Sequence, residues 1–384
     1  MTRVAYVSTY VPQKCGIATY TFHLRRAVNG AKQWRGKDPV VVLRNSTEWQ
    51  TEDPMLWPLF RDAEEDYVKM ARKINHSDID VVSLQHEFGI FGGEAGSYIL
   101  PFVRHLQKPL VTTFHTVFEH PEPPYAPIQR EIAERSAKIV VMNRKAVDLL
   151  HQTFHIPVDN IVFIPHGTPE PEPGRREEWR KELHWSGRKV LMTFGLLNRG
   201  KGVEFILSIL PEIVKRVPNV LYAIVGQTHP EVIKWEGERY REELKEQIRN
   251  NGLENHVVMI DRYMEEPDLV KHLTACDLYI TPYPGLQQIT SGTLAYAVGL
   301  GRPVLTTPYA YAKDLLSDYP ELLLDIQDAQ AWIDRIVSLL SDDRLSEAWG
   351  QKIAQIGKTM HWPEIGKQHA ALFSEVGGLE YAHG

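Results

Sequence analysis

Short apolar runs alternate with longer helical stretches along both halves of the chain. The first half has such runs at 4–7, 40–43, 81–84, 110–114, 139–142 and 161–164, and the second half at 190–194, 220–225, 257–260, 278–281 and 303–306. Apolar runs that are separated by helices indicate parallel strands buried on both faces. Each half is therefore predicted to be an α/β domain with a doubly wound sheet, whose ligands bind beyond the carboxyl ends of the strands.

A segment rich in proline and glutamate separates the two series of strands. It runs over 169–174, and its prolines exclude a helix or a central strand. A short helix over 175–183 is expected before the second series begins. We therefore predict a first domain over 1–168, a linker over 169–185 and a second domain over 186–360. Two such domains joined by one linker would leave a cleft, which is a preferred place for a ligand.

A glycine-rich turn follows the expected strand 190–194. It runs from Gly195 to Gly202 and carries Arg199 and Lys201. The turn nearly matches the phosphate loop of nucleoside triphosphatases, but a glycine stands where that loop needs a hydroxyl for magnesium, which disfavours that class. Two cations at a helix N-terminus suit a diphosphate bound without an obligatory metal. The alternative is a plain strand-to-helix turn with surface basic residues, and we favour the diphosphate.

A second anion-binding end is expected where the helical stretch 294–300 begins. Thr290 or Ser291 is a plausible N-cap, and the backbone N–H groups of Ser291, Gly292 and Thr293 would be free. The helix dipole adds positive potential at this end. Alone, the motif would be ordinary capping. Its occurrence in the same domain as the glycine-rich turn favours a second contact to the anion.

The loop after the first strand is a further candidate. Tyr10 and Lys14 lie in it, and Gly16 at its end permits a close backbone approach at the start of a helix over 17–28. Taken by itself, Gly16 is better explained as a turn glycine.

Polar side chains also follow two other strands of the first domain. His86 and Glu87 come at the end of one strand and His115 at the end of the next, so all three are expected at the carboxyl edge of the sheet. They could bind hydroxyl groups or move protons. The alternative is that such a histidine is only a packed, hydrogen-bonded residue. We favour a functional role for His115 and leave Glu87 open.

Asp78 and Asp80 form a D-x-D pattern, which binds metal-nucleotide complexes in some glycosyltransferases. Here the pattern precedes the strand 81–84, at the end of the strand opposite to the expected ligand edge. We interpret it as a solvated strand entry.

Composition excludes several classes of protein. The length of 384 residues fits two domains, and 43% hydrophobic with 24% charged residues is ordinary globular composition. A net charge of −6 argues against nucleic-acid binding. The two cysteines lie far apart in the sequence, without the paired spacing of a disulfide framework or a zinc site, and the sixteen histidines are interpreted as surface or packing residues. The chain opens on a strand rather than a signal peptide, and no apolar run approaches the roughly 18 residues of a membrane span, so a cytoplasmic protein is predicted.

Together these motifs resemble glycosyltransferase family 4, retaining enzymes of GT-B architecture, over almost the whole chain. The similarity lies in the loop from Pro12 to Tyr20, in the turn from Gly195 to Gly202, in the strands beginning at Leu278 and Pro303, and in the segment after Trp362. The resemblance implies two Rossmann-like domains facing a cleft, with the donor bound by the second. It also implies a C-terminal helix over 361–384 that crosses back to pack on the first domain.

Two departures from the family pattern stand out. The arginine that usually follows the first glycine of the turn is Leu196, so Arg199 would have to replace it. The family usually carries two glutamates separated by seven residues, and Gln288 and Tyr296 occupy those positions. Gln288 can hydrogen-bond a sugar hydroxyl, but it cannot act as a carboxylate.

The resemblance implies transfer of a hexose, mannose or glucose, from a GDP- or UDP-linked donor to a hydroxyl acceptor, without an obligatory metal. The implied residues are catalytic His115, Arg199, Lys201 and Gln288; donor-binding Gly16, Gly195, Arg199, Lys201, Tyr263, Met264, Gln288, Thr290, Ser291, Gly292 and Thr293; and acceptor-binding Tyr10, Lys14, His86 and Glu87. A lipid acceptor would make the protein peripheral to a membrane. A GT-B phosphorylase or nucleotide-sugar epimerase, and a non-catalytic nucleotide-sugar-binding protein, remain alternatives.

Overall fold

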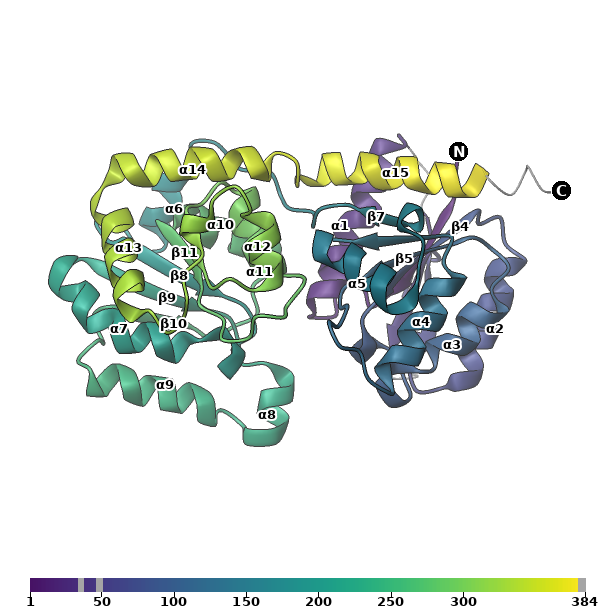
Figure 1. The fold of residues 1–384 in the computed structure, drawn as a ribbon, viewed down its shortest axis with the longest axis horizontal. Coiled ribbons are helices and arrows are strands. Elements are labelled where there is room, and N and C mark those ends of the chain that lie inside the picture. Colours follow the sequence, from purple (N-terminus) through teal and green to yellow (C-terminus); the bar gives the residue numbers. More distant parts are fainter. Residues whose placement is uncertain (34–37, 46–50, 379–384) are drawn as a thin grey trace. The chain divides into compact units, whose positions relative to one another are not determined.

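The computed structural model describes residues 1–33, 38–45 and 51–378. The chain divides into two compact units (Figure 1). Unit 1 contains residues 1–167 and the segment from 362 onward, and unit 2 contains residues 168–361.

Unit 1 is built on a parallel sheet of seven strands, in the order β3-β2-β1-β4-β5-β6-β7. The strands are β1 Val4–Ser8, β2 Val40–Arg44, β3 Leu56–Phe60, β4 Val81–His86, β5 Leu110–Phe114, β6 Lys138–Val141 and β7 Ile161–Phe163. The helices are α1 Gly16–Ala31, α2 Glu64–Asn75, α3 Ile99–His105, α4 Tyr125–Arg135, α5 Arg144–Phe154 and α15 Trp362–Gly378. The sequence analysis missed β3, which carries Pro58 in its centre. β3 is the edge strand, where a missing N–H costs no ladder bond.

Unit 2 has a parallel sheet of five strands, in the order β10-β9-β8-β11-β12. The strands are β8 Lys189–Phe194, β9 Val220–Val225, β10 Val257–Ile260, β11 Leu278–Thr281 and β12 Val304–Thr306. The helices are α6 Arg176–Glu182, α7 Val203–Arg216, α8 Pro230–Glu236, α9 Arg239–Asn250, α10 Glu266–Ala275, α11 Gly292–Gly299, α12 Ala310–Leu315, α13 Ala329–Ser341 and α14 Asp343–Gly357.

Each sheet reverses its strand order once. In unit 2 the chain passes from β8 outward to β10 and then returns to place β11 on the other side of β8. Because crossovers between parallel strands are right-handed, α7 and α9 cover one face, and α10 and α11 cover the opposite face. In unit 1 the same reversal lies between β1 and β4. Ligands of open α/β sheets bind at such switch points, beyond the carboxyl ends of the strands.

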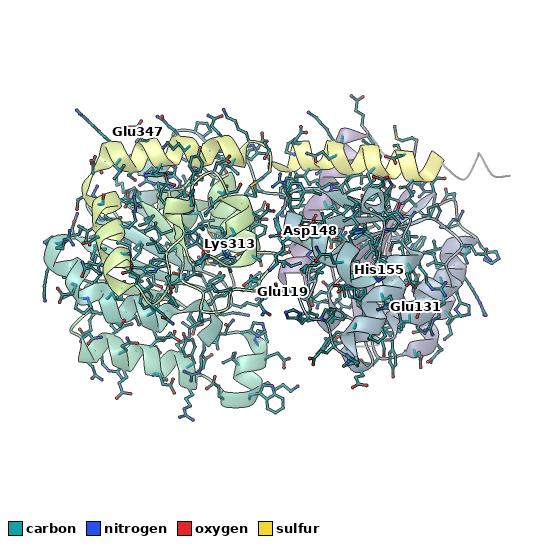
Figure 2. All side chains as sticks on the ribbon, in the orientation of Figure 1. Glu119, Glu131, Asp148, His155, Lys313 and Glu347 are labelled. Atoms are coloured by element: carbon teal, nitrogen blue, oxygen red, sulfur yellow. The ribbon has the colours of Figure 1, made fainter. Side chains whose placement is uncertain are left out.

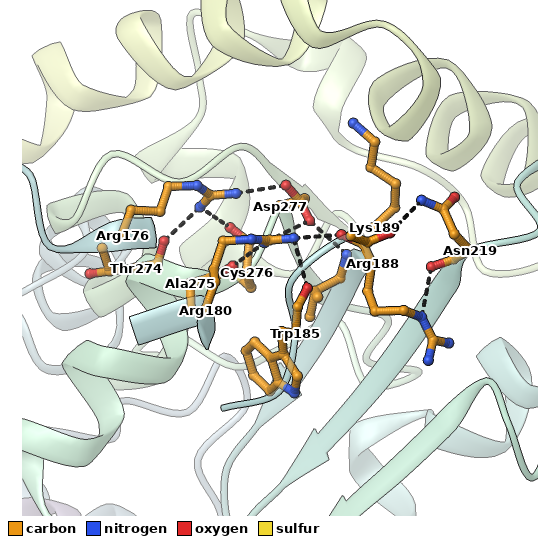
Figure 3. Close-up of polar contacts among 12 residues, drawn as sticks. Arg176, Arg180, Trp185, Arg188, Lys189, Asn219, Thr274, Ala275, Cys276 and Asp277 are labelled. Carbon is orange, nitrogen blue, oxygen red and sulfur yellow. Dashed lines mark hydrogen bonds and ion pairs between the residues drawn. The ribbon is translucent and has the colours of Figure 1, made fainter. Parts of the chain in front are cut away.

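The segment 169–185, expected as a linker, lies within unit 2 (Figure 3). Arg176 and Arg180 of α6 both pair with the carboxylate of Asp277, at 2.6 and 3.2 Å, immediately before β11. The same carboxylate accepts a hydrogen bond from the backbone N–H of Val190 in β8, at 2.7 Å. Trp179 of α6 is 5% exposed in the core of the unit. The helix that follows the proline run is therefore an integral part of unit 2.

The last helix, α15, packs on α1 of unit 1, as predicted. Ile365, Leu372 and Phe373 of α15 are buried in a cluster with Tyr6 and Leu24. The two helices approach closely, since a Cβ on Gly366 would overlap the backbone of Ala27. Residues 379–384 of the predicted C-terminal segment lie outside the described residues.

Candidate functional site

The loops at the switch point of unit 2 are packed too tightly for side chains at Gly226 and Gly202. Gly195, after β8, has φ +138°. A Cβ atom on Gly226, after β9, would overlap the carbonyl oxygen of Gly195. Gly202, at the start of α7, has φ +64°, and a Cβ there would overlap the carbonyl oxygen of Pro282 after β11. Only glycine combines these dihedral angles with this proximity. The three loops therefore meet as one rigid edge.

Lys201 lies at this edge among hydroxyl groups. Its Nζ donates to Tyr283 Oη at 3.1 Å and lies 4.6 Å from the centre of the same ring. Tyr283 Oη is 3.0 Å from Thr293 Oγ1, and the Lys201 Nζ approaches Gly195 closely. Within the described part of the chain, no carboxylate lies within ion-pair distance of this ammonium. Lys201 is thus held in place without being neutralised.

Helix α11 begins beside this lysine. Ser291 is its N-cap, and the Ser291 Oγ accepts from the backbone N–H of Leu294 at 3.4 Å. The N–H groups of Gly292 and Thr293 lie in the first turn, where they have no partner within the helix. Thr290 Oγ1 is buried and has no hydrogen-bond partner among the described residues. This helix end therefore offers N–H and hydroxyl donors next to a fixed ammonium, which is the donor set that an anion requires.

Gln288 and Arg199, both predicted to be catalytic, stand in different surroundings, and the role of Gln288 on a sugar hydroxyl stays a prediction. Gln288 is exposed, and its side-chain amide donates to the carbonyl oxygen of Thr290 at 2.7 Å. Arg199 lies over the ring of Tyr240 at 4.7 Å and pairs with Glu236 at 3.2 Å and Glu243 at 2.8 Å. The expectation that Arg199 and Lys201 point at the same region is wrong, because carboxylates of α8 and α9 bind the guanidinium.

Of the two donor-binding residues predicted after β10, Tyr263 and Met264, only one is partly exposed. Met264 is 5% exposed and belongs to the hydrophobic core of unit 2, so its side chain is a packing residue. Tyr263 is half-buried. Nearby, the hydroxyl of Tyr296 on α11 donates to Glu266 Oε2, the first residue of α10, at 2.7 Å. Glu266 could not be recognised from the sequence as a site residue, because 30 residues separate it from Tyr296 and no local motif joins them.

In unit 1, the loop after β1 carries three predicted binding residues, of which Lys14 and Gly16 are exposed to solvent. Gly16 is the exposed first residue of α1, capped by Cys15, whose Sγ accepts from the N–H of Ala18 at 3.3 Å. Lys14 is exposed as well. Tyr10 is 4% exposed, and its hydroxyl accepts from Arg25 at 3.1 Å. The predicted acceptor contact by Tyr10 is therefore wrong, since its ring is part of the core.

His86 is not available to a substrate either. It is fully buried among the rings of Phe88, Phe91 and Phe114, and neither ring nitrogen has a hydrogen-bond partner among the described residues. Burial lowers the pKa of His86 to about 3. The predicted acceptor role of His86 is wrong, because three aromatic rings enclose it.

Glu87 and His115 lie at the carboxyl edge of unit 1. Glu87 accepts from the N–H of Phe88 at 2.9 Å and from the hydroxyl of Thr116 at 2.5 Å, and burial raises the pKa of its carboxyl. His115 is half-buried, and its Nε2 bonds Gln85 Oε1 at 2.9 Å. Because an amide oxygen only accepts, Nε2 carries the proton and Nδ1 is an acceptor.

The pKa of His115 is lowered to about 3, first by burial and then by the neighbouring imidazoles of His166 and His86. His115 is therefore neutral near pH 7. It is suited to hydrogen-bond a hydroxyl group and poorly suited to take up a proton.

A separate hollow of about 580 Å³ lies along α4 of unit 1. The carboxylate of Glu131 on its wall, labelled in Figure 2, accepts two bonds of 2.7 Å from Arg104 and one of 3.0 Å from Arg135. The charge of Glu131 is thus already paired, and we assign the hollow no function.

Two kinds of feature are absent from the described residues. No three His, Cys, Asp or Glu side chains gather there as a possible metal site. No helix there has the length and apolar character required to cross a bilayer. Asp78 and Asp80, before β4, bind Arg3 through its side chain and its backbone N–H respectively, as a strand entry would.

Both halves of the chain match known families. Residues 16–170 match the family described as Glycosyltransferase Family 4, and residues 188–342 match Glycosyl transferases group 1. The chain is 24% identical over 204 residues to spore coat protein SA of Bacillus subtilis, covering 52% of each chain. It is 29% identical over 197 residues to a GDP-mannose:glycolipid 4-beta-D-mannosyltransferase of Xanthomonas campestris pv. campestris, covering 50% of each. The chain thus spans about half the length of the curated relatives that it matches.

Solved structures share the whole fold. Anabaena HepE in complex with UDP superposes with a TM-score of 0.75 at 16% identity, covering 97% of this chain and all of the other. The likeness confirms the predicted GT-B fold of two Rossmann-like α/β units. With family matches in both halves, the chain belongs to glycosyltransferase family 4.

Proposed function

We propose that this protein transfers a hexosyl group from a nucleoside diphosphate sugar to a hydroxyl acceptor, with the donor diphosphate bound in unit 2. The observation that carries the proposal is the cluster of Lys201, Tyr283 and Thr293 at the switch point, beside the N-terminus of α11. A fixed ammonium and unpaired N–H groups suit an anion that gains charge during the reaction. The family membership supports the same activity.

The proposed chemistry needs no strong base in the protein. The bond between the anomeric carbon and the diphosphate oxygen breaks as the acceptor oxygen forms a bond to the same carbon, on the same face. The proton of the acceptor hydroxyl passes to the departing phosphate. Lys201 and the N–H groups of Gly292 and Thr293 stabilise the charge that accumulates on the diphosphate, and these fixed groups make an obligatory metal unnecessary.

Unit 1 would bind hydroxyl groups of the sugar substrates. His115 is the strongest candidate, because its neutral ring offers Nδ1 as an acceptor at the carboxyl edge. Lys14 and Gly16 lie exposed at the loop after β1. Tyr10 and His86 support this edge from within the core.

Two similar proteins support two donor classes. The similar Anabaena structure holds UDP, and the similar Xanthomonas enzyme is named for GDP-mannose. We propose a GDP- or UDP-linked hexose, mannose or glucose. The assay is release of nucleoside diphosphate from GDP-mannose and UDP-glucose, with and without a panel of sugar and glycolipid acceptors.

Release that requires an acceptor, with formation of a glycoside, supports transfer. Conversion of the donor into its epimer without an acceptor would identify an epimerase instead of a transferase. Turnover that depends on inorganic phosphate would indicate a phosphorylase. Tight binding of the donors without turnover on any acceptor would identify a nucleotide-sugar-binding protein.

Arg199→Ala should have a modest effect on transfer, less than about tenfold in kcat/KM. The guanidinium lies between Glu236 and Glu243, so its removal leaves the donor diphosphate contacts of Lys201 in place. Steady-state kinetics of the variant checks this. If the loss were as large as that expected for Lys201→Ala, Arg199 would have to leave the carboxylates of Glu236 and Glu243 to bind the donor.

A further inference from the structure

We propose that Glu266 binds the ribose hydroxyls of the donor nucleotide and that Tyr296 positions its carboxylate. This assignment rests on the proposed function, since it presumes a nucleoside diphosphate at the N-terminus of α11. It makes Glu266 a specificity-determining residue for ribonucleotides.

The geometry begins with two neighbouring helix ends. Helices α10 and α11 lie on the same face of the sheet, and Figure 1 shows them together, apart from α7 and α9. The bond from the Tyr296 hydroxyl to Glu266 Oε2, at 2.7 Å, joins the start of α10 to the second turn of α11. Tyr296 lies four residues after Gly292, which is about 6 Å along the helix axis. The carboxylate is therefore held within one nucleotide's length of the proposed phosphate site.

The charge of Glu266 decides what it can bind. A carboxylate accepts hydrogen bonds and repels phosphate oxygens, so it cannot be a ligand of the diphosphate itself. A nucleoside diphosphate sugar carries hydroxyl donors on both groups that are esterified to the diphosphate, the hexose and the ribose, and only the ribose is shared by every nucleotide of the proposed class. Dinucleotide-binding sheets of the same doubly wound type use an acidic side chain on ribose hydroxyls in this way.

Tyr296 fixes which way the carboxylate faces. The tyrosine is 7% exposed, and its ring is packed in the core of unit 2. A phenol held by packing donates a directed bond, which restricts the rotamers of the glutamate. The simpler explanation is that Glu266 only stabilises α10 as an acidic residue of its first turn. That role would leave ribose recognition unchanged when the glutamate is replaced.

The test compares nucleotides that differ only in a ribose hydroxyl. Isothermal titration would measure the affinity of UDP and GDP, and then that of the 2′-deoxy and 3′-deoxy forms of the tighter ligand. We expect the wild-type protein to bind the ribonucleotide about tenfold more tightly than at least one deoxy form. Glu266→Gln should lose about tenfold in affinity for the ribonucleotide only, so that this preference disappears. Tyr296→Phe should reduce the preference to about threefold.

The matched control is Glu265→Gln, which removes the same charge from the exposed preceding residue. It should keep the ribonucleotide preference of the wild type. Binding of inorganic pyrophosphate tests the phosphate site separately, because Glu266→Gln should retain it and Lys201→Ala should lose it.

Equal affinity of the wild type for ribo- and deoxynucleotides would overturn the assignment, as would a preference that survives in Glu266→Gln. If pyrophosphate and the nucleotides still depend on Lys201 in that case, the proposed function stands and only the role of Glu266 fails. If the wild type binds none of these ligands, both fail together.

Discussion

Replacing Lys201 by alanine should lower kcat/KM for glycosyl transfer by about two to three orders of magnitude. The departing diphosphate gains negative charge in the transition state, and removal of one preorganised donor from such a site typically costs that much. Lys201 is the ammonium that donates to Tyr283 Oη at the switch point of unit 2. Most of the loss should fall on kcat, because the charge develops as the bond breaks.

The fold should tolerate this change. Lys201 contributes a cation–π contact and one hydrogen bond to Tyr283, so its removal should cost about 1 kcal/mol of folding free energy. Lys215→Ala is the matched control, since it removes an exposed lysine from the other end of α7, where it pairs with Glu212. Activity of Lys201→Ala within a few-fold of that control would remove the charge-stabilising role on which the proposed mechanism depends.

Local sequence was enough to predict the loops at the carboxyl edge of the unit 2 sheet. The strand β8, the glycine turn and the N-cap Ser291 are all determined within a few residues, by apolar pattern, positive φ and side-chain capping. Parallel strands then bring their carboxyl ends together, so Lys201 and Thr293 meet although 91 other residues lie between them in the chain. The topology of the sheet therefore brings residues that are predicted from separate local patterns together at one site.

The direction of individual side chains could not be predicted in the same way. Arg199 is a neighbour of Lys201, but partners 37 and 44 residues later in the chain, Glu236 and Glu243, bind its guanidinium. His86 stands at a strand end as predicted, and three phenylalanines enclose it. Glu266 belongs to no local motif, and its bond to Tyr296 becomes visible in the structure alone. Each of these outcomes depends on tertiary contacts between residues without a fixed spacing.

Acidification should unfold unit 1 before unit 2. Burial is the first cause that lowers the pKa of four histidines of unit 1: His86 and His115 to about 3, and His166 and His369 to about 4. In the unfolded chain the same imidazoles titrate near 6.5. Their folded pKa values are depressed, so the stability that they contribute is complete above pH 6.5. It is lost as the pH falls from 6.5 towards 4.

The size of the effect follows from the two histidines that are fully buried, His86 and His369. At pH 4.5, the depressed pKa of each of these two histidines should lower the free energy of unfolding by about 2–3 kcal/mol. Two such costs approach the whole stability of an ordinary domain, which is about 5–15 kcal/mol. In unit 2, burial also lowers the pKa of His272, but fewer buried imidazoles act there. Hydrogen exchange measured by mass spectrometry between pH 7.5 and 4.5 would follow peptides of the two units separately.

His86→Leu tests the cause directly. Leucine fills nearly the same volume among Phe88, Phe91 and Phe114 and takes up no proton, so the acid midpoint of unit 1 should move to lower pH. The variant should match the wild type or exceed it in stability at pH 7.5, because neither ring nitrogen of His86 has a hydrogen-bond partner to lose. An unchanged midpoint in a folded variant, or simultaneous opening of both units, would mean that protonation of carboxylates sets the acid limit instead.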